Sequence, residues 1–358
     1  MEWIMRFNLI VISMILSHTI SFTNPAIELV WNELPMSVTF EKSLRDGRPS
    51  MAFFHASWCS YCHKLKDEVF SVNAVREKMA EYHLVSIDGD DKGAGSKFFK
   101  SVFGRGFPTT IFYNSSGEEI DRLVGYLPPE DFTNLLKANL SQRNILEILE
   151  EQYLEAPKDR QPELRYNIIE KQFDMGQWDN VLKGIRSYSA HPTYAKYSFD
   201  LKLMRGIIYL KKKSYTLARL YFKVAWDSAI SEKQYMDAVR WLSKLYKVTK
   251  EPEKRLEVFQ AAIDKYGSVA AYNGYAWNAS KTKTNLDTAL SHALKAVKLS
   301  KRKVRVLDTL AAVHYARKEF TETLRISREI LATKPKSSVY AKKHKKYLNA
   351  FRKSLMSD

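Results

Sequence analysis

The stretch Trp58-Cys59-Ser60-Tyr61-Cys62-His63 contains both cysteines of this 358-residue chain. It follows an apolar run at residues 51–56 that is typical of a short buried strand, and apolar residues recur after it at helix-like intervals as far as Met79. Cys59 is therefore expected at the N-terminus of a helix, where unpaired backbone N–H groups stabilise a thiolate. Such a thiolate is a nucleophile, and Cys62, one turn further on, is close enough to close a disulfide with it.

A second motif begins at Gly106. Pro108 precedes an apolar run, rich in β-branched and aromatic residues, at residues 109–113. A proline in this place suits the start of a strand, and an X-Pro peptide bond can be cis. Residues 115–118, Ser-Ser-Gly-Glu, then have the composition of a hairpin turn.

These elements, in this order and spacing, resemble a thioredoxin fold. Residues 58–70 and 106–136 resemble more narrowly the thioredoxin-like domains of the periplasmic disulfide reductase DsbD. The resemblance implies an α/β domain with a mixed sheet flanked by helices. It also implies that Cys59 and Cys62 are the catalytic residues and form a redox-active disulfide.

The same resemblance implies three substrate-binding candidates, Trp58, Phe107 and Pro108. A cis Pro108 would expose the backbone of Phe107 for pairing with an extended substrate chain. Trp58, beside the first cysteine, would either form an apolar contact with that chain or fill the core.

The sequence departs from the thioredoxin pattern at one point. Many thioredoxins carry a buried aspartate six residues before the first cysteine, but Phe53 stands here, and Leu84 aligns with its usual lysine partner. The proton acceptor for Cys62 is then Glu68 or water, although Glu68 is more typical of a solvated surface group. His55 either tunes the thiolate or is a hydrogen-bonded strand histidine.

The run Cys59-Ser60-Tyr61-Cys62-His63 also matches a c-type haem attachment site. The strand pattern before it and the helical pattern after it favour redox chemistry instead. A zinc site would need a second pair of ligands, which a single C-x-x-C motif lacks. We therefore expect neither a cofactor nor a metal.

The remaining pattern up to residue 141 alternates between strands and helices. The expected elements are a strand near 37–40, a helix through 41–45, a strand at 83–88, a helix at 97–103, hairpin strands at 109–114 and 120–125, and a helix at 128–140.

From Ile145 onward helical periodicity dominates, and a repeat is visible. Gly206, Ala218 and Phe222 recur in the small-and-large pattern of a tetratricopeptide array, which this half of the chain resembles. Repeat starts are expected near residues 162, 199, 236, 270 and 304, with a basic capping helix at 340–355. The predicted architecture is thus a thioredoxin-like domain at 22–143 and an all-α, tetratricopeptide-like solenoid at 144–358.

A solenoid of this kind has a concave surface that usually binds an extended peptide or a partner protein. The alternative is that the array only packs against the redox domain or forms a homodimer.

The net charge of +17 is concentrated in the second half of the chain. Residues 22–143 hold 14 Lys/Arg and 16 Asp/Glu, a net of −2, whereas residues 144–358 hold 42 and 23, a net of +19. A basic half can attract acidic proteins, anionic lipids or nucleic acid. Because no nucleic-acid recognition motif accompanies it, we interpret it as a solvated helical surface and expect no nucleic-acid partner.

Residues 1–21 have the pattern of an export signal peptide. Arg6 precedes an apolar core at residues 7–16, and small residues follow. The core is short for a transmembrane helix, although an uncleaved segment would still anchor the chain to a membrane. We expect cleavage near Ser21 and a periplasmic or secreted protein. One cysteine pair in an exported chain of this length favours redox chemistry over a structural staple.

The sequence therefore predicts an exported thiol–disulfide oxidoreductase. Its Cys-Ser-Tyr-Cys pair would reduce or exchange disulfides of client proteins held by the array. Reduction, oxidation and isomerisation all stay open, with the resemblance to DsbD favouring reduction. The alternative function is a tetratricopeptide adaptor with an inactive or redox-regulated thioredoxin-like domain.

Overall fold

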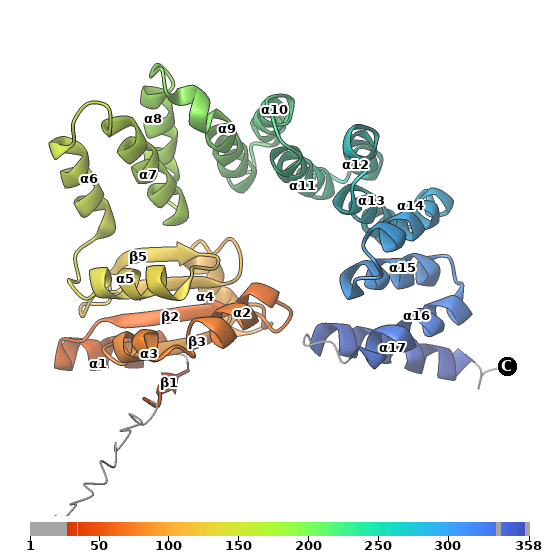
Figure 1. Ribbon diagram of the computed structural model, residues 1–358, viewed down its shortest axis with the longest axis horizontal. Coiled ribbons are helices and arrows are strands. Elements are labelled where there is room, and N and C mark those ends of the chain that lie inside the picture. The colour runs from red at the N-terminus through yellow and green to blue at the C-terminus, as the bar shows by residue number, and fades with distance from the viewer. Residues whose placement is uncertain (1–26, 34, 334–337, 355–358) are drawn as a thin grey trace, which may run out of the picture.

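The computed structural model describes residues 27–33, 35–333 and 338–354, so the predicted signal peptide at 1–21 lies outside the described residues. Up to residue 139 the described chain builds a five-stranded sheet covered by helices (Figure 1). The elements are β1 (Trp31–Asn32), α1 (Met36–Asp46), β2 (Ser50–His55), α2 (Ser60–Glu68), α3 (Asn73–Met79), β3 (His83–Asp88), α4 (Ala94–Ser101), β4 (Thr109–Tyr113), β5 (Glu119–Val124) and α5 (Pro129–Asn139).

The strand order is β1-β3-β2-β4-β5, and β2 lies in the centre. It pairs in parallel with β3 and antiparallel with β4. Met51 and Phe53 of β2 pack against α2, α3 and α5, whereas Ala52 and Phe54 pack against α1 and α4. Both faces of β2 are therefore buried, which explains its continuous apolar run. The predicted mixed sheet flanked by helices is confirmed.

The predicted strand at residues 37–40 is wrong, because these residues belong to α1. Their β-branched and aromatic side chains favour a strand, but Met36, Thr39 and Ser43 recur at helical spacing and are buried. Val38, between them, is exposed. The sheet instead contains β1, which is absent from the prediction because two residues are too few to show a period.

The apolar spacing after Cys62 predicts a single helix to Met79, but the chain forms two, α2 and α3. Ser71 lies between them, and its hydroxyl donates to the Asp67 carbonyl at 2.7 Å, which satisfies one of the last carbonyls of α2. Elsewhere β3, β4, β5 and α5 lie within one residue of their predicted bounds, whereas the helix predicted from Lys97 begins three residues earlier, at Ala94.

From residue 145 the described chain is entirely helical, and the helices pair in sequence. They are α6 (Ile145–Glu155), α7 (Gln161–Asp174) with α8 (Trp178–Tyr188), α9 (Tyr194–Lys211) with α10 (Tyr215–Asp227), α11 (Glu232–Val248) with α12 (Pro252–Tyr266), α13 (Val269–Thr282) with α14 (Leu286–Leu299), α15 (Val304–Ala316) with α16 (Phe320–Ala332), and α17 (Ser338–Ser354). The pairs follow an arc whose inner side carries α7, α9, α11, α13 and α15 (Figure 1).

The predicted helical solenoid is confirmed. The starts predicted near 162, 270 and 304 lie within one residue of the starts of α7, α13 and α15, while α9 and α11 begin five and four residues before the predicted 199 and 236. A side chain at Gly206 would place its Cβ 2.4 Å from the ring of Phe222, so the close approach of α9 and α10 requires a glycine there. Within the described segments, no helix combines the length and apolar character needed to span a bilayer.

A buried ionic contact between β5 and α7 fixes the array to the sheet. Asp121, 1% exposed, accepts from Lys171 Nζ at 2.6 Å. Arg122, 2% exposed, donates through Nη1 to the carbonyl of Asp174 at 3.1 Å. Arg105, just before β4, forms an ion pair with the Asp174 carboxylate. Because these charges are removed from water and satisfied by one another, they hold the first helix pair in one orientation on the sheet.

At the other end of the arc, α17 is fastened by a buried chain of hydrogen bonds. His344 links Ser327 Oγ (2.8 Å from Nδ1) to Asp308 Oδ1 (3.0 Å from Nε2), and Lys343 Nζ lies 2.6 Å from the same Asp308 oxygen. Burial raises the pKa of Asp308, but the bonds from His344 and Lys343 outweigh it and hold that pKa below its ordinary value. Ser327 and His344 are 0% exposed, so this Ser–His–Asp arrangement fastens a helix and offers no accessible nucleophile.

We expect Asp308→Asn to lower the free energy of unfolding by about 2 kcal/mol at pH 7, because a neutral amide would leave the partly buried ammonium of Lys343 without its counter-charge. The folded-state pKa of Asp308 lies below the unfolded one, so its contribution is present above about pH 4 and is lost as the pH falls through the folded pKa. Urea unfolding of wild type and variant at pH 7 and at about pH 3 measures this difference. A gap that stays the same at both pH values would contradict the ionic origin.

Candidate redox site

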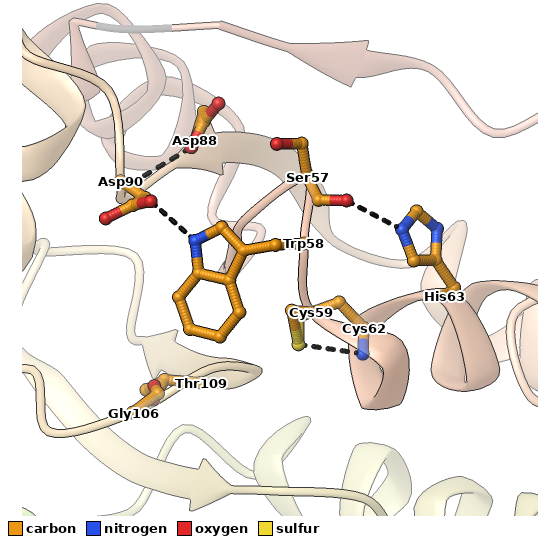
Figure 2. Close-up of a disulfide and its surroundings, with 9 residues drawn as sticks. All are labelled: Ser57, Trp58, Cys59, Cys62, His63, Asp88, Asp90, Gly106 and Thr109. Carbon is orange, nitrogen blue, oxygen red and sulfur yellow. Dashed lines mark hydrogen bonds between the residues drawn. A yellow bond between two sulfur atoms is a disulfide. The ribbon is translucent and has the colours of Figure 1, made fainter. Parts of the chain in front are cut away.

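The cysteine pair lies directly after the central strand β2, at the start of α2. Cys59 is the N-cap residue with extended backbone, and its Sγ accepts a hydrogen bond from the backbone N–H of Cys62 at 3.0 Å (Figure 2). The Cys59 carbonyl accepts from the N–H of His63 at 3.2 Å, which starts the helix. The predicted helix start is confirmed, and the Cys62 N–H, which also donates to the Cys59 carbonyl at 3.1 Å, points at the first sulfur.

The two sulfur atoms are joined in a disulfide, 2.12 Å long, with 5.2 Å between the Cα atoms. Cys59 is 4% exposed and Cys62 is 2% exposed. Both side chains belong to the buried cluster that β2, α2, α3 and α5 form. Both cysteines are thus almost fully buried, Cys62 slightly more so than Cys59.

Exposed aromatic side chains lie next to the cysteines in the chain. Trp58 is 48% exposed and Tyr61 is 59% exposed, so neither fills the core. The Trp58 indole N–H donates to Asp90 Oδ2 at 2.5 Å (Figure 2). The rings of Trp58 and Phe107 form an edge-to-face contact at a centroid distance of 5.9 Å. Asp90 N–H in turn donates to Asp88 Oδ1 at 3.0 Å. The loop after β3 thus holds the tryptophan in place beside the disulfide.

Asp90 is absent from the residues predicted above. It lies 32 positions beyond Trp58, in the polar loop after β3. The signal that would have found it is the parallel pairing of β2 with β3, since parallel strands bring the segments after their carboxyl ends to one edge of the sheet.

The segment before β4 supplies the other side of the site. The Phe107–Pro108 peptide bond is cis, as the resemblance implied. Phe107 stacks on Phe99 at 4.5 Å and packs against the cluster that contains both cysteines. The ladder between β2 and β4 begins only at Thr109, so Phe107 lies outside the sheet pairing. The substrate-binding role of Trp58, Phe107 and Pro108 stays a prediction.

The expected apolar replacement for the aspartate–lysine pair is present. Phe53 is 0% exposed and Leu84 is 2% exposed, within the same cluster as the cysteines. A cation lies nearby that the sequence did not indicate: Lys66 Nζ is 5.4 Å from the centre of the Phe53 ring. Burial lowers the pKa of Lys66, with Asp67 and Asp88 acting in the opposite direction.

The other titratable candidates have partners away from the sulfurs. His55 Nε2 lies 3.0 Å from Ser86 Oγ, and burial lowers the pKa of this histidine. Glu68 is exposed and accepts from the Tyr126 hydroxyl at 3.2 Å. These contacts agree with a hydrogen-bonded strand histidine and a surface carboxylate.

The remaining alternatives concern metal and haem. His63 Nε2 lies 3.1 Å from the Ser57 carbonyl, and both sulfurs that a haem attachment would use are joined to each other (Figure 2). In the described part of the chain, no group of three or more His, Cys, Asp or Glu side chains is arranged to hold a metal ion.

A sheet of order β1-β3-β2-β4-β5, with a C-x-x-C disulfide at the start of the helix after its central strand, defines a thioredoxin-like domain. A family model described as a thioredoxin-like domain matches residues 36–139. The chain is 30% identical over 93 residues to the thiol:disulfide interchange protein DsbD of Actinobacillus pleuropneumoniae, covering 25% of this chain and 16% of that protein.

A second relative is the chloroplastic thioredoxin-like protein HCF164 of Oryza sativa, 27% identical over 96 residues, covering 26% of this chain and 34% of that protein. The chain thus spans only 16% and 34% of the lengths of these two relatives. Among solved structures, YrrB, described as a tetratricopeptide protein with an unusual peptide-binding site, aligns with 58% of this chain and 99% of its own at 14% identity and a TM-score of 0.40.

We expect Asp90→Ala to slow reaction with a disulfide substrate about fivefold, because the Trp58 ring loses the charged acceptor that orients it. The second-order rate constant for reduction of insulin with intact disulfides measures this effect. Asp159→Ala, which removes an exposed aspartate from the loop before α7, is the matched control and should leave the rate unchanged. An equal effect of both substitutions would show that net charge, not the Trp58 contact, sets the rate.

Proposed function

We propose that this protein is a thiol–disulfide oxidoreductase that acts on disulfides of client proteins. The observation that carries the proposal is the Cys59–Cys62 disulfide at the start of α2, with the Cys62 N–H 3.0 Å from the Cys59 sulfur. A helix N-terminus stabilises negative charge on that sulfur, both as an attacking and as a leaving group. The thioredoxin-like family match over residues 36–139 and the similarity to DsbD and HCF164 support the same chemistry.

In the reducing direction, the Cys59 thiolate attacks one sulfur of a client disulfide. A Cys59–client bond forms, the client S–S bond breaks, and the other client sulfur leaves as a thiolate that takes up a proton. The Cys62 thiol then loses its proton and attacks Cys59, which releases the second client thiolate and closes the Cys59–Cys62 disulfide. The client gains two electrons and the cysteine pair loses two. A dithiol donor must reduce the pair again for turnover.

The order of attack follows from the burial of the two sulfurs. Cys59 is the more exposed of the two and lies beside Trp58 and Tyr61, so a client meets it first. Cys62 is buried in the first turn of α2 and is bonded to Cys59. We therefore infer that Cys59 is the nucleophile and Cys62 the resolving cysteine.

The helical array is proposed to hold the client. It is fixed to the sheet at β5 and α7, and it curves so that α17 comes to lie opposite α2 (Figure 1). A chain bound on the inner side of the arc is thus held on the side of the domain where α2 lies. This arrangement favours a client-binding role over simple packing against the redox domain.

The test is whether the full chain reduces insulin with intact disulfides, with dithiothreitol as the dithiol donor. We expect insulin precipitation at a rate well above that with dithiothreitol alone. A rate equal to that of dithiothreitol alone would contradict the redox proposal. The protein would then be better interpreted as an adaptor.

We further propose that the protein acts outside the cytoplasm. The signal-like pattern of residues 1–21 and the use of its only two cysteines in a disulfide support this. N-terminal sequencing of the protein from its native cells tests the proposal. A chain that still begins at Met1 and is recovered with the cytoplasmic fraction would contradict it.

A further inference from the structure

A pocket of about 350 Å³ opens on the inner side of the arc, between the first helices of three consecutive pairs. Met236 and Arg240 of α11, Asn273 and Trp277 of α13, and Arg305 of α15 belong to its lining, and α17 contributes Tyr340 at one end. The pocket lies far along the chain from the cysteines, and the redox chemistry does not use it.

Asn273 is the first sign of a missing ligand. Its side chain is 7% exposed, and its Oδ1 is buried without a hydrogen-bond partner. Leaving a buried polar atom unpaired costs about 1–3 kcal/mol, so folded proteins rarely do so without a reason. A ligand that donates an N–H to Oδ1 would remove the penalty.

The charges around Asn273 indicate what that ligand carries. Arg305 is exposed and forms no ion pair with a carboxylate in the described parts of the chain. Arg240, 54% exposed, pairs with its helix neighbour Asp237 at 2.5 Å. Two guanidinium groups from different helices therefore border the same pocket, one of them without an acidic partner. Guanidinium groups bind carboxylates through paired hydrogen bonds.

The wall beside Asn273 is also cationic. Lys281 Nζ lies 4.1 Å and Lys343 Nζ 4.8 Å from the centre of the Trp277 ring. Burial and then the neighbouring Lys343 lower the pKa of Lys281, as expected where positive charges crowd together. Asp308 is the acid at this wall, and His344 and Lys343 already satisfy it.

We propose that this pocket binds an extended, acidic segment of a client chain. The Asn273 amide pairs with one peptide unit: Oδ1 accepts from its N–H, and Nδ2 donates to its C=O. Arg240 and Arg305, one repeat to either side of Asn273, each take an acidic side chain of the segment. An internal segment fits better than a chain terminus, because a terminus ends in one carboxylate whereas two guanidinium groups flank the amide.

This inference rests on the client-holding role proposed for the array but not on the redox chemistry, since no cysteine takes part in binding. The test uses the full chain in its disulfide form and fluorescence anisotropy of three labelled decapeptides. The first alternates glutamate and serine and has both ends blocked. The second has glutamine in place of glutamate. The third is the glutamine peptide with a free terminal carboxylate.

We expect the glutamate peptide to bind and each glutamine peptide to bind at least about tenfold more weakly. Arg305→Gln and Asn273→Ala should each weaken binding of the glutamate peptide about tenfold. Arg186→Gln, which removes the same charge from the exposed face of α8, should leave binding unchanged. Because Asn273 Oδ1 has no partner to lose, Asn273→Ala should unfold at or above the wild-type temperature, which shows that its binding defect is not a folding defect.

Three results would overturn the proposal. Equal binding of the glutamate and blocked glutamine peptides would remove the acidic requirement. Tighter binding of the free-carboxylate peptide than of the glutamate peptide would show a terminus-binding site. An equal loss on Arg186→Gln and Arg305→Gln would mean that the basic surface as a whole, and not this pocket, attracts the peptide.

Discussion

Replacing Cys59 with serine is expected to reduce the rate of insulin reduction by about a thousandfold or more, to that of dithiothreitol alone. A serine hydroxyl at this position stays protonated at neutral pH, so the Cys62 N–H that now points at Sγ would face a group with no nucleophilic charge. Cys62 cannot substitute for it, because Cys62 is 2% exposed and lies one turn inside the helix.

Cys62→Ser is the matched variant, and its expected result differs in kind. Cys59 can still attack, but nothing resolves the Cys59–client bond, so a mixed disulfide should accumulate on non-reducing gels. Both variants should unfold at similar temperatures, since each removes the same disulfide. If Cys59→Ser kept its activity, or if Cys62→Ser accumulated no adduct while Cys59→Ser did, the assignment of nucleophile and resolving cysteine would be reversed or lost.

Asp121→Asn is expected to destabilise the protein by about 3 kcal/mol and to lower its first thermal unfolding transition by several degrees. The carboxylate is 1% exposed and its Oδ1 lies 2.6 Å from Lys171 Nζ, so an amide would leave a partly buried ammonium without its counter-charge. The same change weakens the link between β5 and α7. We therefore also expect protease cleavage near α6 to become faster.

Asp179→Asn is the control for this prediction. It breaks an ion pair with Lys212 of the same type, but Asp179 is 87% exposed, and pairs in water contribute at most about 1 kcal/mol. Calorimetry of the three proteins at one pH separates the two cases. Equal transition temperatures for Asp121→Asn and Asp179→Asn would mean that the buried contact does not hold the array on the sheet.

The redox motif could be predicted from the sequence because its information is local. The strand before Cys59, the helix after it and the residues between them are contiguous, so apolar spacing alone places the first sulfur at a helix start. The same holds for the helix pairs, where Gly206 must be small because Phe222 packs on it. The prediction for residues 37–40 was wrong, because the burial of Met36, Thr39 and Ser43 on one face of α1 outweighs the strand preference of a short β-branched run.

The contacts that position these elements could not be predicted, because they join residues far apart in the chain. Asp90 meets Trp58 only when β2 and β3 lie side by side. Lys171 reaches Asp121 across 50 positions, and both look like ordinary surface charges in the sequence. In the sequence, Asn273 likewise looks like a polar residue on the solvated face of a helix. It is buried only because α11, α13 and α15 come together around the pocket.

The buried ionic contact between α7 and β5 has a consequence for which clients can react. If the sheet and the arc keep one orientation, the acidic anchor and the reactive cystine of a client must be separated by a spacer that reaches from one site to the other. Each residue of such a spacer extends by at most about 3.6 Å, so a shorter tether cannot engage both places at once. A matching tether raises the local concentration of the cystine without any new contact. The protein would then select substrates by the number of residues between their acidic segment and their reactive cystine.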